Sequence, residues 1–182
     1  MKSLPTRLDG VLLLEPDVHG DERGFMVETF SRDAWADVGV DVEFVQHNHS
    51  RSGRNILRGL HFQTEPGQAK LVRCARGKVF DVAVDLRRGS PTYGQWEGYD
   101  LDDERHRQLF VPVGFAHGFC VLSEFADIAY LLSATYDPVT EAGIAWDDPD
   151  VGVDWPVSGP LLSERDKQAP RLAEVADSLP FR

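Results

Sequence analysis

The chain has 182 residues, of which 42% are hydrophobic and 27% are charged, a composition typical of a folded globular protein and not of a disordered one. Thirty acidic residues outnumber nineteen Lys and Arg residues, which gives a formal net charge of −11. Such an acidic surface repels DNA, RNA and anionic lipid, so we exclude these partners, and any anionic small ligand must be bound by a few locally gathered basic side chains.

The N-terminal segment and the cysteines predict where the protein resides. Residues 1–7 contain no apolar core of the kind found in signal peptides, and no apolar stretch approaches the length needed to span a bilayer. Cys74 and Cys120 each lie in a short apolar run, which favours buried thiols in a reducing compartment over a disulfide scaffold. We therefore expect a cytoplasmic protein.

Short apolar runs, separated by turn residues, follow one another along most of the chain and predict strands. The predicted strands are Val11–Leu14, Phe25–Phe30, Val42–Val45, Ile56–Phe62, Ala69–Ala75, Val79–Leu86, Gln95–Leu101, Gln108–Val111, Gly118–Leu122 and Ala126–Leu132. The run Val79–Asp85 alternates only partly, so we interpret it as a central strand that is covered on both faces. Many short strands at this spacing favour a β-sandwich or barrel over βαβ units.

Helical signals are confined to two places. One is Ser31–Val38, where Ser31 is a candidate cap, and the other is the tail after Pro160, where Ser163 and Glu164 open a polar helical stretch. No internal repeat or composition shift marks a second domain. We expect a single domain over residues 1–182, with a strand-rich core at about 8–150 and a helical tail at about 160–182.

Three segments are richer in polar and ionisable residues than a strand scaffold requires: Gln46–Ser50, Arg58–Gln63 followed by Lys70, and Pro112–Phe119. His61 alone, on an apolar strand, fits a satisfied core histidine. Its neighbours favour a ligand or a reaction, because burying Arg58, His61, Gln63 and Lys70 on one strand pair without a ligand would be costly.

Other residues of the right chemical type are ambiguous when each is taken alone. Tyr130 and Tyr136 are consistent with packing or with function. Asp166, in the predicted tail helix, looks like a solvated helix residue.

A metal site is one alternative for this region. The spacing Pro112-x-Gly114-x-x-His117 resembles half of the cupin metal motif, and His47-x-His49 imitates the other half because alternate strand residues share a face. The Glu that should follow the second histidine of the pair is missing, as is the Asn after His117. Ligand sets without a carboxylate bind metals poorly, so we expect a plain barrel histidine at position 117.

At these segments the sequence resembles the dTDP-4-dehydrorhamnose 3,5-epimerase family. Nine blocks appear in the order that the family has them. The blocks are Gly20–Phe25, Gln46–Ser50, Leu57–Gln63, Lys70–Arg73, Val79–Asp85, Gly89–Gly94, Gly114–Phe119, Trp146–Pro149 and Leu161–Asp166. Each block alone is modest evidence, whereas nine in order are specific.

The resemblance implies an all-β fold, a cupin-like jelly roll (β-sandwich or barrel) with a few short peripheral helices. It implies a cofactor-independent epimerase, with no metal and no organic cofactor, that inverts C3 and C5 of dTDP-4-dehydro-6-deoxy-D-glucose to give dTDP-4-dehydro-L-rhamnose. The implied partner is therefore a dTDP-linked 4-keto-6-deoxyhexose. It further implies a homodimer whose active sites are shared between the protomers.

The resemblance also implies roles for individual residues. His61 matches the catalytic base, Asp166 the carboxylate that orients it, Tyr136 the acid on the opposite face and Lys70 the group that supports the enolate. Substrate-binding positions fall on Arg23, Phe25, Glu28, Gln46, Asn48, Arg58, Asp81, His117 and Tyr130. In the family, some of these residues come from the partner protomer.

The sequence departs from the family pattern at several positions. Leu131 stands where many members have Lys, Phe62 replaces a common Tyr, and the loop at 64–69 is one residue short. Related enzymes invert only one of the two carbons, so a single-centre epimerase of another dTDP-4-keto-6-deoxy sugar is the first alternative. A metal-dependent or sugar-binding, non-catalytic cupin is the alternative from a different functional class.

Overall fold

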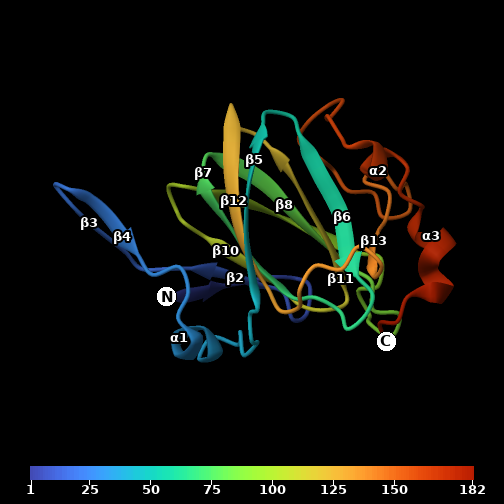
Figure 1. The fold of residues 1–182 in the computed structure, drawn as a ribbon, viewed down its shortest axis with the longest axis horizontal. Coiled ribbons are helices and arrows are strands. Elements are labelled where there is room, and N and C mark those ends of the chain that lie inside the picture. Colours follow the sequence, from blue (N-terminus) through green and yellow to red (C-terminus); the bar gives the residue numbers. More distant parts are fainter.

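Two antiparallel sheets packed face to face form the body of the protein in a computed structural model that describes residues 1–182 (Figure 1). The six-stranded sheet has the order β1 (Lys2–Leu4), β2 (Leu12–Glu15), β10 (Gln108–Val111), β7 (Lys70–Arg76), β12 (Phe125–Leu132), β5 (Gln46–Gly53). The five-stranded sheet has the order β13 (Glu141–Gly143), β6 (Leu57–Gln63), β11 (Phe115–Val121), β8 (Lys78–Asp85), β9 (Trp96–Asp102). This arrangement confirms the predicted all-β class.

The remaining elements are peripheral. The hairpin of β3 (Val18–Asp21) and β4 (Gly24–Val27) projects away from the body, as Figure 1 shows. Helix α1 spans Arg32–Ala36, and the tail contains α2 (Glu164–Lys167), α3 (Leu172–Val175) and a 3₁₀ turn at Ala176–Ser178. No helix of the structure has the length and apolar character needed to cross a membrane.

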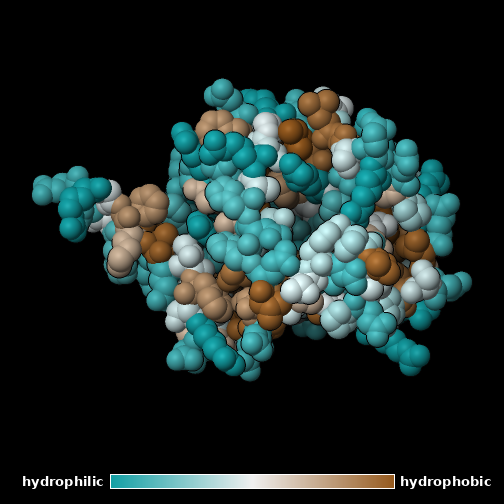
Figure 2. Space-filling view, viewed as in Figure 1, coloured by the Kyte–Doolittle hydropathy of each residue, from teal (hydrophilic) through white to brown (hydrophobic).

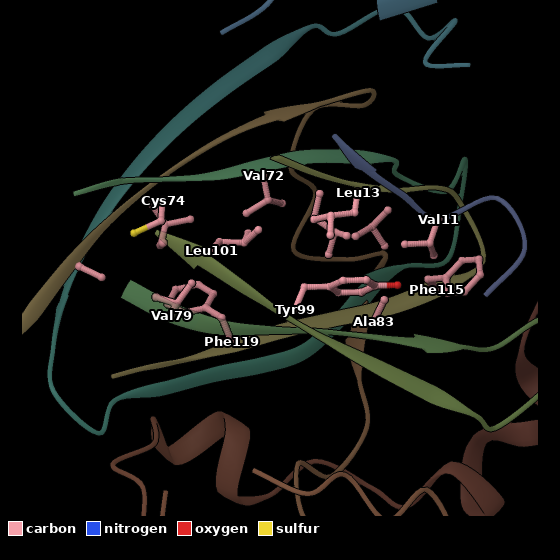
Figure 3. Packing of buried hydrophobic residues seen from close by; sticks show 14 of the residues in the cluster. Val11, Leu13, Val72, Cys74, Val79, Ala83, Tyr99, Leu101, Phe115 and Phe119 are labelled. Carbon is pink, nitrogen blue, oxygen red and sulfur yellow. The ribbon is translucent and has the colours of Figure 1, made fainter. Parts of the chain in front are cut away.

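Apolar side chains from both sheets meet between them and form the largest buried cluster (Figure 3). Val72 and Cys74 of β7 lie opposite Val79 of β8 and Leu101 of β9, and all four are 0% exposed. The inward positions alternate along each strand, as the pleat of a half-buried strand requires. Cys74 and Cys120 are free and buried, as predicted.

The outer faces of the two sheets are covered by the C-terminal segment and by helix α1. The C-terminal segment packs Trp155, Leu172 and Phe181 on the outer face of the five-stranded sheet. Trp35 of α1 covers part of the outer face of the six-stranded sheet. Strand β8 lies between β11 and β9, and Val82, Ala83 and Val84 are all 0% exposed, which confirms that it is a central strand covered on both faces.

Most of the predicted strands are present within one to three residues at their ends, but one is wrong. Residues Val42–Val45 form no strand, and the strand begins instead at Gln46. Val42 and Phe44 pack near α1, so their hydrophobicity reflects contact with that helix. The predicted strand at Phe25–Phe30 ends at Val27, and strands β1, β3 and β13 were not predicted.

Both predicted helical regions exist but are shorter than expected. Ser31 occupies the N-cap of α1 without a capping hydrogen bond from its side chain, whereas the Ser163 side chain accepts from the backbone N–H of Asp166. The tail is divided into two single-turn helices on either side of Pro170, because proline has no N–H to donate and disfavours a helical residue before it.

A buried carboxylate fixes the turn that follows β8. Asp85 is 0% exposed and accepts hydrogen bonds from Arg87, Ser90 and Thr92. Burial alone would raise the pKa of Asp85, but these hydrogen bonds outweigh it and the pKa is lowered. The folded state therefore contains an ionised carboxylate that depends on its partners.

We expect Asp85→Ala to lower the free energy of unfolding by roughly 3 kcal/mol, because it removes several charge-assisted hydrogen bonds and leaves Arg87 without its partner. Asp100→Ala is the matched control, since Asp100 forms a surface ion pair with Lys78 and its loss should cost at most about 1 kcal/mol. Urea unfolding measures both values. Equal effects of the two substitutions would contradict the importance assigned to Asp85.

Candidate active site

A pocket of about 200 Å³ lies between the two sheets and gathers most of the predicted site residues. It is lined by Asn48, Ser50, Arg58, His61, Gln68, Lys70, His117, Phe119, Ile128, Tyr130, Leu132, Tyr136 and Glu141. Seven of these were predicted from the sequence: Asn48, Arg58, His61, Lys70, His117, Tyr130 and Tyr136. The five-stranded sheet supplies the histidines, and the six-stranded sheet supplies Lys70 and Tyr130.

A β-bulge in β6 places two of these side chains on one face. Residues three apart point to opposite sides of a regular strand, yet Arg58 and His61 both line the pocket. The pairing register explains this, because His117 lies opposite His61 while Phe119 lies opposite Arg58, so β6 contains one extra residue.

Two glycines allow this bulge to pack against the neighbouring strand. Gly59 has a φ of +132°, and a Cβ there would lie 2.5 Å from the Cα of Gly118. A Cβ on Gly118 would in turn lie 2.7 Å from the carbonyl oxygen of Arg58. Only glycine fits at both positions. The two glycines therefore allow the close strand packing that places Arg58 and His117, the site residues that precede them.

His61 forms a dyad with Asp166. Its Nε2 lies 2.7 Å from Asp166 Oδ1, and Asp166 is 5% exposed. Burial alone would raise the pKa of Asp166, but hydrogen bonds from His61, Ser163 and the backbone N–H of Gly59 outweigh it and the pKa is lowered. An ionised Asp166 fixes the ring orientation and favours the tautomer with the proton on Nε2, which leaves Nδ1 free to accept a proton.

Lys70 is a buried lysine, and its burial favours the neutral amine over the ammonium form. Its Nζ donates to the backbone carbonyl of His61 at 3.2 Å. Burial lowers its pKa to about 8, although the carboxylates of Glu141 and Asp81 partly offset this effect. An ammonium group held in this way is poorly solvated and is available to stabilise negative charge on a bound molecule.

A second buried histidine–carboxylate pair lies beside Lys70. His117 Nε2 is 2.8 Å from Asp81 Oδ1, and Asp81 is 0% exposed. The other carboxylate oxygen of Asp81 has no hydrogen-bond partner. Asp81 therefore lies behind the pocket wall, where it orients His117 and adds negative charge near Lys70.

The loop between β12 and β13 closes one side of the pocket. Tyr136 in this loop is 50% exposed, and its backbone N–H donates to Gln46 Oε1 at 2.8 Å. The Gln46 amide also donates to Asn48 Oδ1 at 3.0 Å, so the predicted binding residue Gln46 supports the loop and the pocket wall. Tyr130 lies on β12, directly beside the strand that contains Lys70.

Two charged residues at the pocket, Glu141 and Arg165, were not assigned a role from the sequence. Glu141 lines the pocket and forms an ion pair with Arg165. Glu141 belongs to no recognisable motif, so only the pairing of the three-residue strand β13 with β6 reveals it. Arg165 lies within a matched block, and its position next to Asp166 was the available signal.

Three predicted binding residues lie away from the pocket, on or next to the projecting hairpin. Arg23, Phe25 and Glu28 are exposed and belong to the projecting hairpin or the residue after it. The side chain of Arg23 is 85% exposed and pairs with Asp21, and Phe25 is 62% exposed. Figure 2 shows hydrophobic colouring on the hairpin between its hydrophilic tip and the body. These residues do not contribute to the pocket of their own chain.

The arrangement does not match the metal alternative. His47 and His49 occupy exposed positions of β5, whereas Asn48 and Ser50 point into the pocket that contains His117. His47 and His49 therefore lie on the outer face of the six-stranded sheet, whereas His117 faces its inner side from the opposite sheet. No group of three or more His, Cys, Asp or Glu side chains is arranged to hold a metal ion.

The pocket combines three chemical functions. The His61–Asp166 pair has the chemistry of a base, Lys70 that of a cation, and the two tyrosines carry hydroxyl groups that can donate a hydrogen bond. A base beside a cation suits the removal of a proton from carbon next to a carbonyl group, because the resulting charge spreads onto oxygen.

Comparison with known proteins identifies the relatives of this chain. The family model of dTDP-4-dehydrorhamnose 3,5-epimerase matches residues 5–174. The dTDP-4-dehydrorhamnose 3,5-epimerase of Shigella flexneri is 52% identical over 177 residues, which cover 96% of this chain and 98% of that protein.

Two solved structures are informative. The dTDP-6-deoxy-D-glucose-3,5-epimerase of Legionella pneumophila, in complex with dTDP-4-keto-L-rhamnose, is 44% identical with a TM-score of 0.96, covering 100% of this chain and 98% of that one. A 3′-monoepimerase from Streptomyces bikiniensis, in complex with dTDP, is 38% identical with a TM-score of 0.91, covering 97% and 92%. The latter is a double mutant, in which a histidine is replaced by Asn and a tyrosine by Phe.

The environment of Lys70 generates a stability prediction. A lysine whose folded-state pKa is about 8 holds fewer protons between pH 8 and 10.5 than the unfolded chain does, so its charge destabilises the folded state at neutral pH. We expect Lys70→Met to raise the free energy of unfolding at pH 7 by at most roughly 3 kcal/mol, and the gain to vanish above about pH 10.5.

Lys78→Met is the control, because Lys78 is 44% exposed and its ion pair with Asp100 lies on the surface. This substitution should change the free energy of unfolding by at most about 1 kcal/mol. Urea unfolding at pH 7 and at pH 10.5 measures the effect. A destabilised Lys70→Met variant at pH 7 would show that Lys70 is not held at an energetic cost.

Proposed function

The chain belongs to the dTDP-4-dehydrorhamnose 3,5-epimerase family, and we propose that it inverts C3 and C5 of dTDP-4-dehydro-6-deoxy-D-glucose to give dTDP-4-dehydro-L-rhamnose. The observation that carries this proposal is the convergence of the His61–Asp166 dyad and Lys70 in one pocket. Relatives named as 3,5-epimerases that align over nearly the whole chain support the choice of substrate and of both carbons.

The base acts first in this proposal. Hydrogens on C3 and C5 flank the C4 ketone and are acidic because their removal gives an enolate. Nδ1 of His61 accepts the proton, while Asp166 holds the ring through Nε2 and stabilises the imidazolium that forms. Lys70 places its ammonium near the developing negative charge on the C4 oxygen, which lowers the barrier to proton removal.

The acid must act from the face opposite His61, and the structure provides two tyrosines. The resemblance implied this role for Tyr136, but we propose Tyr130. The hydroxyl of Tyr136 is engaged in a hydrogen bond to Glu141, which raises the pKa of the phenol. Tyr130 comes from the sheet that faces the strand bearing His61 and lies next to the strand of Lys70.

The spacing in the monoepimerase variant also supports Tyr130. Its substituted histidine precedes its substituted tyrosine by 70 positions. In this chain His61 precedes Tyr130 by 69 positions and Tyr136 by 75. A loop at 64–69 that is one residue shorter than the usual form, as the resemblance implies, would account for the difference of one.

The substrate carries a diphosphate, which needs cations that the acidic surface does not otherwise provide. Arg58 is exposed at the pocket and is held by Ser52, with Nε 2.9 Å from Oγ. Arg23 and Phe25 are too far out on the hairpin to serve their own pocket, so we propose that the protein is a homodimer in which the hairpin of each protomer completes the site of the other. The exposed apolar residues of the hairpin, Val18, Phe25 and Met26, support such a contact.

A single-centre epimerase is the second candidate, favoured by the similarity to the 3′-monoepimerase. Incubation with substrate in D₂O distinguishes the two. We expect deuterium at both C3 and C5 and the L-rhamno product by NMR, whereas deuterium confined to one carbon would support the second candidate.

His61→Asn should lower turnover by about 10²-fold or more while the protein stays folded, because it removes the proposed base. A near-normal rate would contradict the assignment of the base.

The two tyrosines can be separated by the same exchange experiment. We expect Tyr130→Phe to let His61 exchange substrate hydrogen for deuterium without inversion, because Phe fills the space but donates no proton. Tyr136→Phe should still form inverted product. Mass spectrometry and NMR measure exchange and inversion. The opposite pattern would return the role of acid to Tyr136.

Sharing of the sites can be tested with mixed dimers. Arg23→Ala should weaken dTDP binding by about 1.5–3 kcal/mol in calorimetry, the worth of a charge-assisted phosphate contact. If Arg23 serves the partner's pocket, a heterodimer of Arg23→Ala and His61→Asn protomers contains one intact site and one doubly altered site. We expect such purified heterodimers to recover about half of the wild-type activity. Activity no higher than half that of the Arg23→Ala homodimer would show that both residues serve the same protomer.

A further inference from the structure

Glu141 lies on the same side of the five-stranded sheet as the base. In the pairing of β13 with β6, Gly143 is opposite His61 and Glu141 is opposite Gln63, two residues further along each strand. Side chains two residues apart share a face of a sheet. Glu141 accordingly lines the same pocket as His61, Lys70 and Tyr136.

The carboxylate of Glu141 is anchored from the tail of the protein. Arg165 Nη1 donates to Glu141 Oε2, and the side chain of Glu141 is 14% exposed while that of Arg165 is 51% exposed. Arg165 is adjacent in sequence to Asp166, the partner of His61. The turn that delivers Asp166 to the base therefore also fixes the position of Glu141.

Glu141 is ionised, and its negative charge acts on Tyr136 and Lys70. Burial would raise the pKa of Glu141, but hydrogen bonds from Arg165 and Tyr136 outweigh it and the pKa is lowered. Of the two carboxylates that partly offset the effect of burial on the pKa of Lys70, Glu141 and Asp81, Glu141 has the larger effect.

The other titratable and charged groups of the pocket come from four strands and the loop before β13. They are Asp81 of β8, His61 and Arg58 of β6, His117 of β11, Tyr130 of β12 and Tyr136 of the loop. Two further carboxylates lie behind the pocket wall, where Asp81 is paired with His117 and Asp166 is paired with His61. Glu141 is thus the one carboxylate that lines the pocket itself.

We propose that Glu141 is a positioning residue for the epimerisation: anchored by Arg165, it holds Tyr136 at the pocket wall and places a negative charge in the pocket that contains Lys70. This inference rests on the proposed function, because it assigns Lys70 the support of the enolate. A purely structural ion pair at this place would affect stability and leave the pH dependence of activity unchanged. A positioning role instead changes how activity depends on pH.

The expected sign follows from the chemistry of Lys70. Lys70 must be protonated to stabilise an enolate, so kcat/KM of the wild type should fall as pH rises through about 8. Glu141→Gln keeps the size and the hydrogen-bonding oxygen of the side chain but removes its charge. We expect the alkaline limb of the profile to move to lower pH by several tenths of a pH unit in this variant, with activity at pH 6.5 to 7 much less affected.

Glu164→Gln is the matched control, because Glu164 is an exposed carboxylate of the same tail and pairs only with Lys167. Glu164→Gln changes the net charge by the same amount as Glu141→Gln. It should leave the alkaline limb of the kcat/KM profile at the wild-type pH. Glu141→Asp retains the charge and should place the limb between those of the wild type and Glu141→Gln. An NMR titration of ¹³C-labelled Lys70 in each variant measures the pKa of Lys70 directly and does not require substrate turnover.

The outcomes separate this inference from the proposed function. An active wild type whose alkaline limb and Lys70 titration are unchanged in Glu141→Gln would overturn the role of Glu141 alone. A wild type that does not exchange substrate protons, or a fully active Lys70→Met variant, would overturn the proposed function itself. A limb that moves in Glu141→Gln and not in Glu164→Gln supports the inference.

Discussion

The close approach of β6 and β11 at Gly59 and Gly118 is the constraint on which the site depends. Without a Cβ on either residue the two backbones come close enough for β6 to contain an extra residue, and this bulge turns both Arg58 and His61 toward the pocket. The same bulge brings the backbone N–H of Gly59 to Asp166. The proposed base, its carboxylate partner and a phosphate-binding candidate are thus placed by one local feature of the backbone.

The pocket is held open at an energetic cost that the rest of the sandwich offsets. The space between the sheets is filled by aliphatic and aromatic side chains near β8 and β9, where residues such as Val79 and Leu101 are fully buried (Figure 3). Toward β5 and the loop before β13 the same space contains Lys70, the histidines and the tyrosines. Burying a lysine there lowers its pKa and weakens the fold at neutral pH, which is the usual relation between a reactive site and stability.

The sequence was sufficient to predict the class of fold and most strands, because their apolar alternation is strong. It failed at β5, where the inward side chains are Asn48 and Ser50, so hydrophobicity does not mark the strand. The dyad was predictable only through resemblance, since Asp166 lies 105 residues from His61 and no local pattern joins them. Glu141 was not predictable in either way, because its position follows from the register of a three-residue strand.

The two-sheet architecture suits a reaction that inverts a carbon centre. Inversion requires a proton to leave from one face of the sugar ring and another to arrive from the opposite face. His61 comes from the five-stranded sheet, whereas Tyr130 and Lys70 come from the six-stranded sheet that faces it. A sugar ring bound between the sheets would meet the proposed base on one side and the proposed proton donor on the other. The spacing of the sheets, which the core side chains set, then fixes the distance between acid and base, so the packing at Val79 and Leu101 bears on the chemistry as well as on stability.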